Sequence, residues 1–497
     1  MKHERGLRGP NLCRSLRRAA LGILPLMALL SLALPVASIC PAQAPAAFAK
    51  KLSPKAKRAA RKNKVSRQRA SRDQQRERDL ERARSRVIPI PDAATAVPRN
   101  LTAPETAPPP APDPNRGTKP FTLQDKKAII LDAPPDVLKL VGGHVIVGYH
   151  AADQLTPLLE RGAIGGVFVT ARNAHRRTKA SLASEIAGFR AKAAAAGRDA
   201  FWLATDQEGG PVSRLSPPLP YQPSLHKLLS VTIPEERREA VAAYAAKQSK
   251  ALAELGINLN FAPVADINHN VRAPRDRHTR IRSRAISADP AIVSSAARTY
   301  CAELAKAGVH CTLKHFPGIG RIAADTHVTS ARLDTARDVL AETDWVPFRE
   351  VISASPAFVM IGHPHVQSLD KTRPASTSPA VIQRLLRDSW GFQGVIVTDD
   401  LAMGAITRHV FGGMAAAAVD AINAGADLVL IGSDGDEVYD VLYALIEAHE
   451  QGRLDSAKLA ASDKRLKAAA AELTRSARIT NGRDPAPPAS KTTTARQ

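Results

Sequence analysis

Two adjacent carboxylates are the first residues in this sequence whose position indicates catalytic chemistry. Asp399 and Asp400 directly follow the apolar run Val395 to Thr398. A carboxylate at the end of a buried strand, held by neighbouring donors, stays ionised and can act as a nucleophile. We expect one of the pair to point toward the site and Asp400 to be the N-cap of the following helix. Asp399 is therefore the candidate nucleophile.

A second segment joins an imidazole to a carboxylate. The stretch Lys314-His315-Phe316-Pro317-Gly318-Ile319-Gly320 begins on a predicted strand and leads through a loop to Asp325-Thr326-His327. An Asp two residues from a His can hydrogen-bond the imidazole and raise its pKa, which gives a proton donor and acceptor near neutrality. A lone Asp-x-His is equally compatible with a chance salt bridge in a surface loop. The other clusters of polar residues decide between these two interpretations.

A third cluster is Asp206-Gln207-Glu208-Gly209-Gly210 together with Arg214. Asp206 follows a strand-like run and can accept hydrogen bonds from hydroxyl groups, while Arg214 can donate them. The glycine pair indicates a tight turn or a close backbone approach. The alternative is that Asp206 caps a helix.

The elements that must position these residues alternate regularly between residues 125 and 475. Short apolar runs are separated by Ala/Leu-rich helical segments such as Pro234 to Leu255, Pro290 to Ala307 and Thr407 to Ala424, several of which end at glycine. The pattern predicts an α/β fold, a (β/α)8 barrel, in preference to an open doubly wound sheet. The eight runs are Val145 to Gly148, Gly166 to Thr170, Phe201 to Thr205, Leu259 to Pro263, Cys311 to Lys314, Phe358 to Ile361, Val395 to Thr398 and Leu428 to Ile431.

Polar residues follow five of the runs, at the strand ends where such barrels carry their active sites. We therefore expect them to meet at one end of the barrel, with the loop that bears His327 folded over the opening to face Asp399. These residues are Asp206, Asp266, Lys314 with His315, His363, and Asp399.

Together with Asn260-Phe261-Ala262-Pro263-Val264, these ordered motifs resemble glycoside hydrolase family 3, most closely its single-domain bacterial β-N-acetylglucosaminidases. The resemblance covers roughly residues 125–475. It implies that Asp399 forms a covalent glycosyl-enzyme and that His327, with Asp325 as its partner, is the acid/base. It also implies that sugar is bound by Asp206, Arg214, Arg284, Lys314 and His315, with Arg284 in a loosely matching segment.

The sequence departs from the family pattern at three positions. Ile319 stands where the family often has His, Pro211 replaces a common Arg, and Thr326 replaces the usual Ser of the Asp-Ser-His motif. We expect Thr326 to be tolerated. We expect Ile319 to affect the packing of its loop and the reaction rate more than the type of reaction.

The resemblance predicts a retaining β-N-acetylhexosaminidase that acts on a carbohydrate, such as peptidoglycan fragments, without a metal or cofactor. Three alternatives remain at this point. One is a β-glucosidase of the same family, and another is a phosphorylase, because a histidine acid/base repels phosphate less than a carboxylate would. The third is a non-catalytic wall-binding barrel. The sequence does not indicate an oligomeric state.

The terminal segments predict export. Residues 1–49 have arginines, an apolar run from Ala19 to about Ala37, and small residues after it, the layout of a signal peptide or a retained N-terminal anchor. Residues 50–119 form a basic and then Pro/Ala-rich linker, residues 120–478 the catalytic barrel, and residues 479–497 a disordered tail. The expected location is periplasmic, or anchored in the inner membrane and facing the periplasm, or secreted.

The net charge of +23 is concentrated near the N-terminus. Residues 50–86 carry 16 Lys or Arg against 4 Asp or Glu, and residues 1–49 carry 6 against 1, which leaves only about +6 for the remainder. The basic arm is either a solvated spacer or a contact to anionic membrane or wall polymer. It lacks the interleaved aromatic residues of a single-stranded nucleic-acid binder, so no specific nucleic-acid partner is expected.

Four cysteines are too few for a disulfide scaffold. Cys301 and Cys311 fall on a predicted helix and the next strand. We expect two buried thiols there, with a disulfide as the alternative. No Cys/His spacing matches a zinc site.

Overall fold

A computed structural model describes residues 121–480, except residues 433 and 434. The predicted signal or anchor, the basic arm and the tail from residue 481 onward lie outside the described residues. No helix within the described ranges is long and apolar enough to cross a bilayer.

The centre of the domain is a closed barrel of eight parallel strands in the order β1-β12-β11-β9-β7-β6-β3-β2. Each strand lies within or overlaps one of the eight predicted apolar runs, so the predicted (β/α)8 barrel is confirmed. The strands are β1 (Val145–Gly148), β2 (Gly166–Phe168), β3 (Trp202–Thr205), β6 (Leu259–Asn260), β7 (His310–Phe316), β9 (Phe358–Ile361), β11 (Ile396–Asp400) and β12 (Leu428–Ile431).

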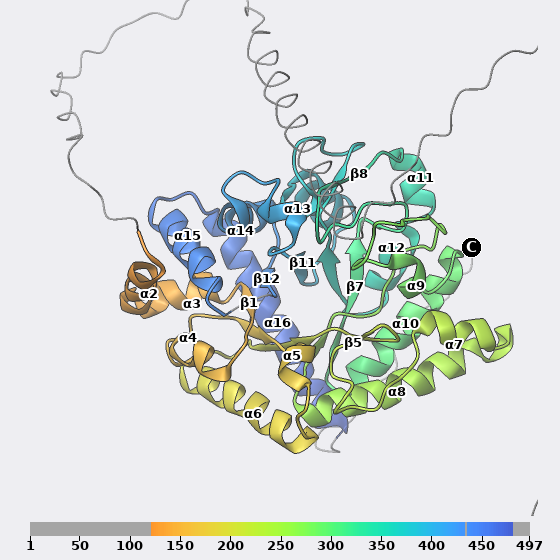
Figure 1. The fold of residues 1–497 in the computed structure, drawn as a ribbon, viewed down its shortest axis with the longest axis horizontal. Coiled ribbons are helices and arrows are strands. Elements are labelled where there is room, and N and C mark those ends of the chain that lie inside the picture. The colour runs from red at the N-terminus through yellow and green to blue at the C-terminus, as the bar shows by residue number, and fades with distance from the viewer. Residues whose placement is uncertain (1–120, 433–434, 481–497) are drawn as a thin grey trace, which may run out of the picture. The chain divides into compact units, whose positions relative to one another are not determined.

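Helices surround this barrel (Figure 1). They are α2 (Leu123–Asp132), α3 (Pro135–Gly142), α4 (Thr156–Glu160), α5 (Ala171–Ala174), α6 (Lys179–Ala195), α7 (Leu225–Val231), α8 (Arg237–Leu255), α9 (Ile281–Arg284), α10 (Pro290–Lys306), α11 (Arg337–Glu342), α12 (Val346–Ile352), α13 (Gly404–Thr407), α14 (Gly413–Ala424), α15 (Val438–Glu450) and α16 (Ser456–Thr480). Short 3-10 helices are η1 (Ala152–Leu155), η2 (Pro234–Glu236) and η3 (Ala375–Thr377), and η4 (Ala380–Ser389) is a π-helix.

Two small sheets lie outside the barrel. The strands β4 (Gln207–Gly209) and β5 (Val212–Ser213) form an antiparallel pair directly after β3. The strands β8 (Ala331–Leu333) and β10 (Pro364–Val366) pair in parallel and connect the loops that follow β7 and β9. Both pairs therefore belong to loops at the carboxyl ends of barrel strands.

One predicted helix, Thr407 to Ala424, is broken. α13 ends at Thr407 and α14 begins at Gly413, while Gly412 and Gly413 have positive φ angles of 77° and 60°. Two successive residues in the left-handed region interrupt a right-handed helix, and glycine adopts that region without a Cβ clash. At the other end of α14, Gly425 has a φ of 105° and is the predicted glycine cap.

The barrel interior is filled by large apolar side chains, including Ile146, Trp202 and Phe358. Leu466 of α16 belongs to the same cluster, and His310 at the start of β7 hydrogen-bonds the carbonyl of Ala469 through Nε2 at 3.0 Å. α16 therefore packs at the amino ends of the strands. This closure leaves the carboxyl ends as the open side of the barrel.

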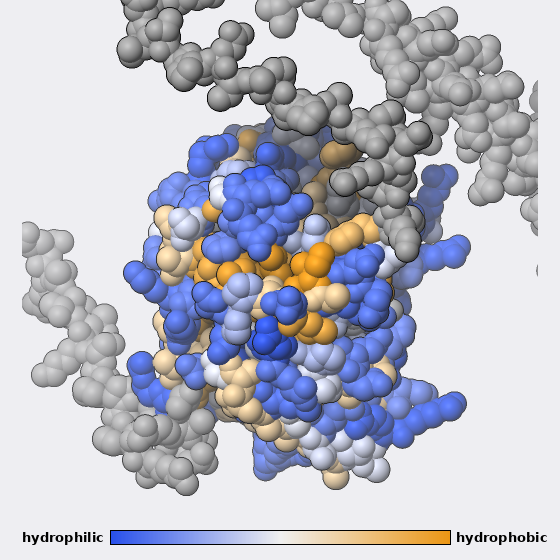
Figure 2. Space-filling model, turned by 90° about the vertical axis from the view of Figure 1, so that its left-hand side faces the viewer, coloured by the Kyte–Doolittle hydropathy of each residue, from blue (hydrophilic) through white to orange (hydrophobic). Residues whose placement is uncertain are grey.

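α2 attaches to α15 by both charge and apolar contact. Lys126 pairs with Asp440 at 2.7 Å, and the rings of Phe121 and Tyr443 are 5.1 Å apart. On the face toward which α2 lies, apolar side chains gather among hydrophilic ones (Figure 2). Phe121, Leu123 and Ile129 are the large exposed apolar residues of this segment.

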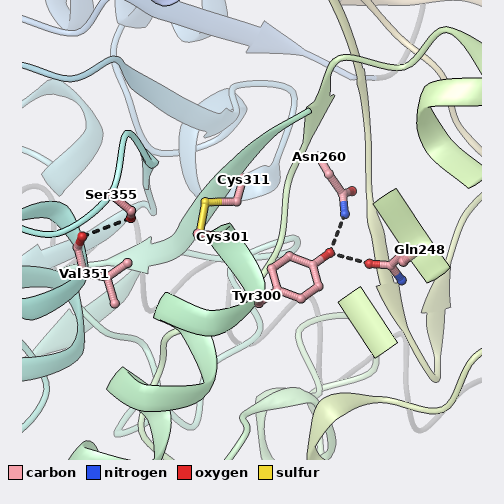
Figure 3. Close-up of a disulfide and its surroundings, with 7 residues drawn as sticks. All are labelled: Gln248, Asn260, Tyr300, Cys301, Cys311, Val351 and Ser355. Carbon is pink, nitrogen blue, oxygen red and sulfur yellow. Dashed lines mark hydrogen bonds between the residues drawn. A yellow bond between two sulfur atoms is a disulfide. The ribbon is translucent and has the colours of Figure 1, made fainter. Parts of the chain in front are cut away.

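Cys301 and Cys311 form a disulfide, so the expectation of two free thiols was wrong (Figure 3). α10 and β7 are joined by a short turn that makes the two elements antiparallel neighbours, and this brings the two Cα atoms within 5.3 Å of each other. That separation is within the range that a disulfide requires. The cross-link lies near the start of β7, the strand that ends in Lys314, His315 and Phe316.

Candidate active site

A cavity of about 350 Å³ opens at the carboxyl ends of the barrel strands. Seven of the eight predicted site residues line it, and the eighth, Asp325, bonds to His327. The structure therefore brings the predicted site residues together at one end of the barrel. The seven are Asp206, Arg214, Arg284, Lys314, His315, His327 and Asp399.

Asp399 lies at the end of β11 and is only partly exposed. Burial acts to raise the pKa of its carboxyl, but the nearby imidazoles of His315, His363 and His327 oppose this and hold the pKa below its usual value. Its Oδ1 also accepts the N–H of Asp400 at 2.9 Å. The carboxylate is therefore ionised over the whole neutral range, as a nucleophile must be.

Asp400 does not cap the following helix, so that expectation was wrong. α13 begins at Gly404, after Met403, whereas Oδ1 of Asp400 accepts the N–H groups of Ala402 and Gly432 at 2.9 and 2.8 Å. Burial raises the pKa of Asp400 to about 7 despite these two bonds. β11 continues two residues beyond the predicted run, to Asp400, and the Asp400 side chain connects the end of β11 to the segment after β12.

The loop that bears His327 is fixed through Asp325. Oδ1 of Asp325 lies 3.1 Å from both the backbone nitrogen and Nδ1 of His327. Its Oδ2 accepts the N–H groups of Arg277 and His278 at 3.1 and 3.2 Å, and these bonds lower the pKa of Asp325 against the effect of burial. An ionised Asp325 thus connects two loops and occupies one ring nitrogen of His327.

The pKa of His327 is lowered, contrary to the expectation that Asp325 raises it. Partial desolvation by the surrounding loops is the largest effect and disfavours the imidazolium, although the side chain remains 41% exposed, and Asp399 and Asp325 only partly compensate. The sequence indicated the charge partner but not the partial desolvation of the ring. A lowered pKa makes the imidazolium a stronger acid and leaves less of it at neutral pH.

Four charged residues form a buried cluster on one side of the cavity. The guanidinium of Arg284 holds both carboxylate oxygens of Glu208, at 2.6 and 2.9 Å. Lys314 Nζ lies 2.6 Å from Asp206 and 2.7 Å from Glu208. Although burial acts to raise the pKa of Glu208, the two cations hold it at about 2. The cluster therefore presents Lys314, Arg284 and Asp206 in fixed positions.

Glu208 was not predicted as a site residue, although it lines the cavity. The signal was present in the sequence. Side chains at alternate positions of an extended segment share a face, so a cavity-facing Asp206 makes Glu208 its same-face neighbour. The turn that follows uses Gly209 and Gly210, whose φ angles are 91° and 63°.

His315 is oriented by Asp266, which has no role in the sequence prediction beyond its place at a strand end. Asp266 Oδ2 accepts the backbone N–H of His315 at 3.0 Å and lies 2.7 Å from its Nδ1. Oδ1 of the same carboxylate accepts the N–H of Ile319 at 2.7 Å. Ile319 itself is buried in a small apolar cluster with Val264, so it packs this loop against the barrel rather than facing solvent.

Asn260 positions the segment that contains Asp206 and Glu208. Its amide accepts the N–H of Gln207 at 2.9 Å and donates to the carbonyl of Gln207 at 3.0 Å. Nδ2 also donates to the hydroxyl of Tyr300 at 2.8 Å, and that hydroxyl donates to Gln248 (Figure 3). A buried polar network thus extends from the disulfide-bearing helix α10 to the site.

Arg214 differs from the other cations of the site because it is exposed. Its backbone N–H donates to the carbonyl of Asp206 at 3.1 Å, and within the described part of the chain its guanidinium makes no hydrogen bond or ion pair. It is therefore available to a bound molecule. Across residues 121–480, omitting 433 and 434, no group of three or more His, Cys, Asp or Glu is placed to hold a metal ion.

The barrel and its cavity define a (β/α)8 protein with an ionised carboxylate and an Asp-supported imidazole at the carboxyl ends of its strands. Residues 137–469 match the glycosyl hydrolase family 3 N-terminal domain, and the chain belongs to that family.

Named relatives agree with this assignment. A beta-hexosaminidase of Stenotrophomonas maltophilia is 34% identical over 289 residues, which are 58% of this chain and 81% of that protein. Beta-hexosaminidase A of Pseudoalteromonas piscicida is 30% identical over 331 residues, 63% of this chain but only 54% of that relative's length. A solved family 3 beta-N-acetylglucosaminidase from Paenibacillus sp. is 31% identical with a TM-score of 0.62, and the match covers 68% of this chain and 62% of that one.

Proposed function

We propose that this chain is a retaining β-N-acetylhexosaminidase that releases terminal β-linked N-acetylglucosamine. The observation that carries the proposal is the presence of ionised Asp399 and the Asp325-supported His327 around one cavity. Similarity to proteins named beta-hexosaminidase supports the N-acetylated sugar. A family 3 β-glucosidase would use the same nucleophile, so the sugar assignment needs its own test.

In the proposed first step, an oxygen of Asp399 attacks the anomeric carbon and the glycosidic C–O bond breaks. The leaving oxygen takes a proton from His327, so the leaving group departs as a neutral alcohol. In the second step, His327 removes a proton from water while the water oxygen attacks the same carbon. This releases the sugar and restores the Asp399 carboxylate. Two inversions at one carbon give net retention.

The remaining site residues bind the sugar in this scheme. Lys314 and Arg284 donate hydrogen bonds and Asp206 accepts them. His315 is held between Asp266 at Nδ1 and Arg284, whose Nη2 lies 3.3 Å from its Nε2, and it lines the same cavity. Arg214 reaches the same cavity from the β4–β5 hairpin. A cavity of about 350 Å³ is of the size that encloses a small ligand such as one sugar ring.

We further propose that the protein is exported and acts on wall-derived glycans outside the cytoplasm. The Cys301–Cys311 disulfide supports export, because disulfides persist in oxidising compartments. The signal-like segment within residues 1–49 supports it independently.

The function is tested by incubating the purified chain with an aryl β-N-acetylglucosaminide and the matching aryl β-glucoside in parallel. We expect release from the N-acetylated substrate, no release by Asp399→Asn, and the β-anomer as the first product by proton NMR. A preference for the glucoside would overturn the N-acetyl assignment. An initial α-anomer would overturn retention, and a sugar phosphate formed only in phosphate buffer would replace hydrolysis by phosphorolysis. If wild type releases neither aglycone, the chain is a carbohydrate-binding barrel instead.

A further inference from the structure

The loop formed by residues 271–284, between β6 and α10, is unusually basic. It contains six arginines and one acidic residue, Asp276. Arg284 is buried against Glu208, but the other five are exposed. Among the described residues, none of these five has a side-chain hydrogen bond or an ion pair. The exposed five are Arg272, Arg275, Arg277, Arg280 and Arg282.

The nearby carboxylates of Asp276 and Asp325 bind backbone N–H groups of this loop. They do not pair with its exposed arginine side chains. Asp276 accepts the N–H groups of Thr279 and Arg280, both at 2.8 Å. Asp325 accepts those of Arg277 and His278. The loop therefore has a fixed backbone that carries a concentrated positive charge on its outer side.

A groove of about 880 Å³ runs along that outer side. The cations that line it are Lys227 of α7, Arg272, Arg280 and Arg282, and they outnumber its one carboxylate, Asp276. Ile281 and Ile322 form part of its wall. The groove thus combines several cations with an apolar surface, which suits an organic anion better than a small inorganic ion.

The same loop borders the active-site cavity on its other side. His278 lines that cavity, and its ring centre lies 5.4 Å from the ring centre of His327. The hydroxyl of Thr279 lies 3.4 Å from Nδ1 of His327. An acid/base must contact the glycosidic oxygen, so the leaving part of a substrate begins beside His327. The basic loop is next to that point.

We propose that this groove is a subsite for a carboxylate carried by the leaving part of the substrate. The proposal rests on the proposed glycosidase function and adds the chemical class of the aglycone, an acidic sugar or a sugar bearing an acidic peptide. Arginine binds carboxylates through paired N–H donors, and two or three arginines on one fixed loop can engage a single flexible anion.

The test uses two disaccharides that differ in one charge. N-acetylglucosaminyl-β-1,4-N-acetylmuramic acid has a lactyl carboxylate, and its methyl ester has the same leaving oxygen without the charge. The readout is the ratio of kcat/KM for the acid to kcat/KM for the ester. We expect a ratio of about 5 to 10 for wild type at low salt, since exposed charge-assisted contacts are individually weak and several act on one carboxylate.

The variant Arg280→Gln/Arg282→Gln should reduce this ratio to about 1 to 2 for the same reason. The matched control is Arg298→Gln/Arg384→Gln, which removes two exposed arginines of α10 and η4 and should keep the wild-type ratio. Added salt should lower the ratio of wild type, which tests the proposal even if a variant does not fold.

A wild-type ratio of one, with the aryl N-acetylglucosaminide still hydrolysed, overturns the groove proposal and leaves the proposed function intact. An unchanged ratio in the Arg280/Arg282 variant overturns it as well. If no N-acetylglucosaminide is hydrolysed, the proposed function fails. Calorimetry then tests the groove separately, by comparing the binding of N-acetylmuramic acid and its methyl ester to wild type and to the Arg280/Arg282 variant. Tighter binding of the acid to wild type, lost in the variant, supports the groove proposal. Equal binding of the acid and the ester overturns it.

Discussion

Oδ1 of Asp325 lies 3.1 Å from Nδ1 of His327, and the same carboxylate bonds to the backbone of Arg277 and His278. Because Asp325 occupies Nδ1, the other ring nitrogen, Nε2, is the one left to exchange a proton with a substrate. Asp325 is therefore a positioning residue for His327 as well as a connection between two loops.

His327→Ala should reduce hydrolysis in a way that depends on the leaving group. A poor leaving group such as a sugar alcohol needs the proton, so we expect kcat/KM to fall by about 100- to 1,000-fold for a disaccharide. A dinitrophenyl glycoside leaves as a stable anion and should lose far less. Parallel kinetics on the two substrates measure this, and equal losses would contradict proton donation by His327.

The pH profile should have its basic limb below pH 6.5. Partial desolvation lowers the pKa of His327 from its ordinary value of 6.5, so the imidazolium loses its proton at a lower pH than a free imidazole and general-acid catalysis falls accordingly. The acidic limb should lie below pH 3.8, because Asp399 stays ionised down to its lowered pKa. The measurement is kcat/KM against pH with a disaccharide.

Asp325→Asn provides the internal control for this assignment. It removes a negative charge that favours the imidazolium, so the basic limb should move to still lower pH. A limb that stays in place would assign the titration to a group other than His327.

Glu208→Gln should destabilise the fold, because it leaves Arg284 and Lys314 without their shared buried countercharge. We expect the free energy of unfolding at pH 7 to fall by about 3 to 5 kcal/mol, measured by urea denaturation. In wild type the stabilisation is complete above pH 4.5, the ordinary pKa of Glu, and is lost as pH falls toward the folded-state pKa of about 2. Glu208→Gln should lose less stability than wild type across that range.

The exposed pair of Lys179 and Glu254 offers a matched control for that experiment. Both side chains are more than 40% exposed, so water screens the charge. Glu254→Gln should change the urea midpoint little. A similar loss in both variants would indicate that burial of the Glu208 cluster does not determine its contribution.

Cys301→Ala/Cys311→Ala should lower the free energy of unfolding by about 3 kcal/mol, the loop-closure value for a cross-link of this length. The two residues are 10 apart in sequence. Urea denaturation of wild type with and without reductant should give a comparable difference. If reductant leaves the wild-type midpoint unchanged, the disulfide does not form in the protein.

The barrel was predictable because its strands are continuous apolar runs and its helices have a different period, so the two alternate visibly along the sequence. The strand ends then placed Asp206, Lys314, His315 and Asp399 at one end of the barrel. The interruption of a helix was harder to predict, because the break at Gly412 and Gly413 depends on backbone angles that a helical apolar pattern does not reveal.

What the sequence did not reveal depends on side-chain direction and burial. The Cys301–Cys311 bond requires a particular rotation of α10 relative to β7, which the sequence period alone does not fix. The pKa of His327 depends on how closely its loop packs, and charge spacing along the chain gave the opposite direction. Glu208 was also missed, although two-residue alternation from Asp206 would have been sufficient to indicate it.

The backbone of the His327 loop is fastened to the polypeptide that follows Asp399. The N–H of Gly404 donates to the carbonyl of His327 at 2.9 Å, and that of Ala405 to Thr326 at 3.1 Å. The loop that carries the proton donor is therefore attached to the segment that carries the nucleophile, because Gly404 is only five residues after Asp399. Lengthening the turn at residues 401–403 would displace the imidazole even though it is some 70 residues away in sequence, so protein engineers should treat the two segments as a single unit.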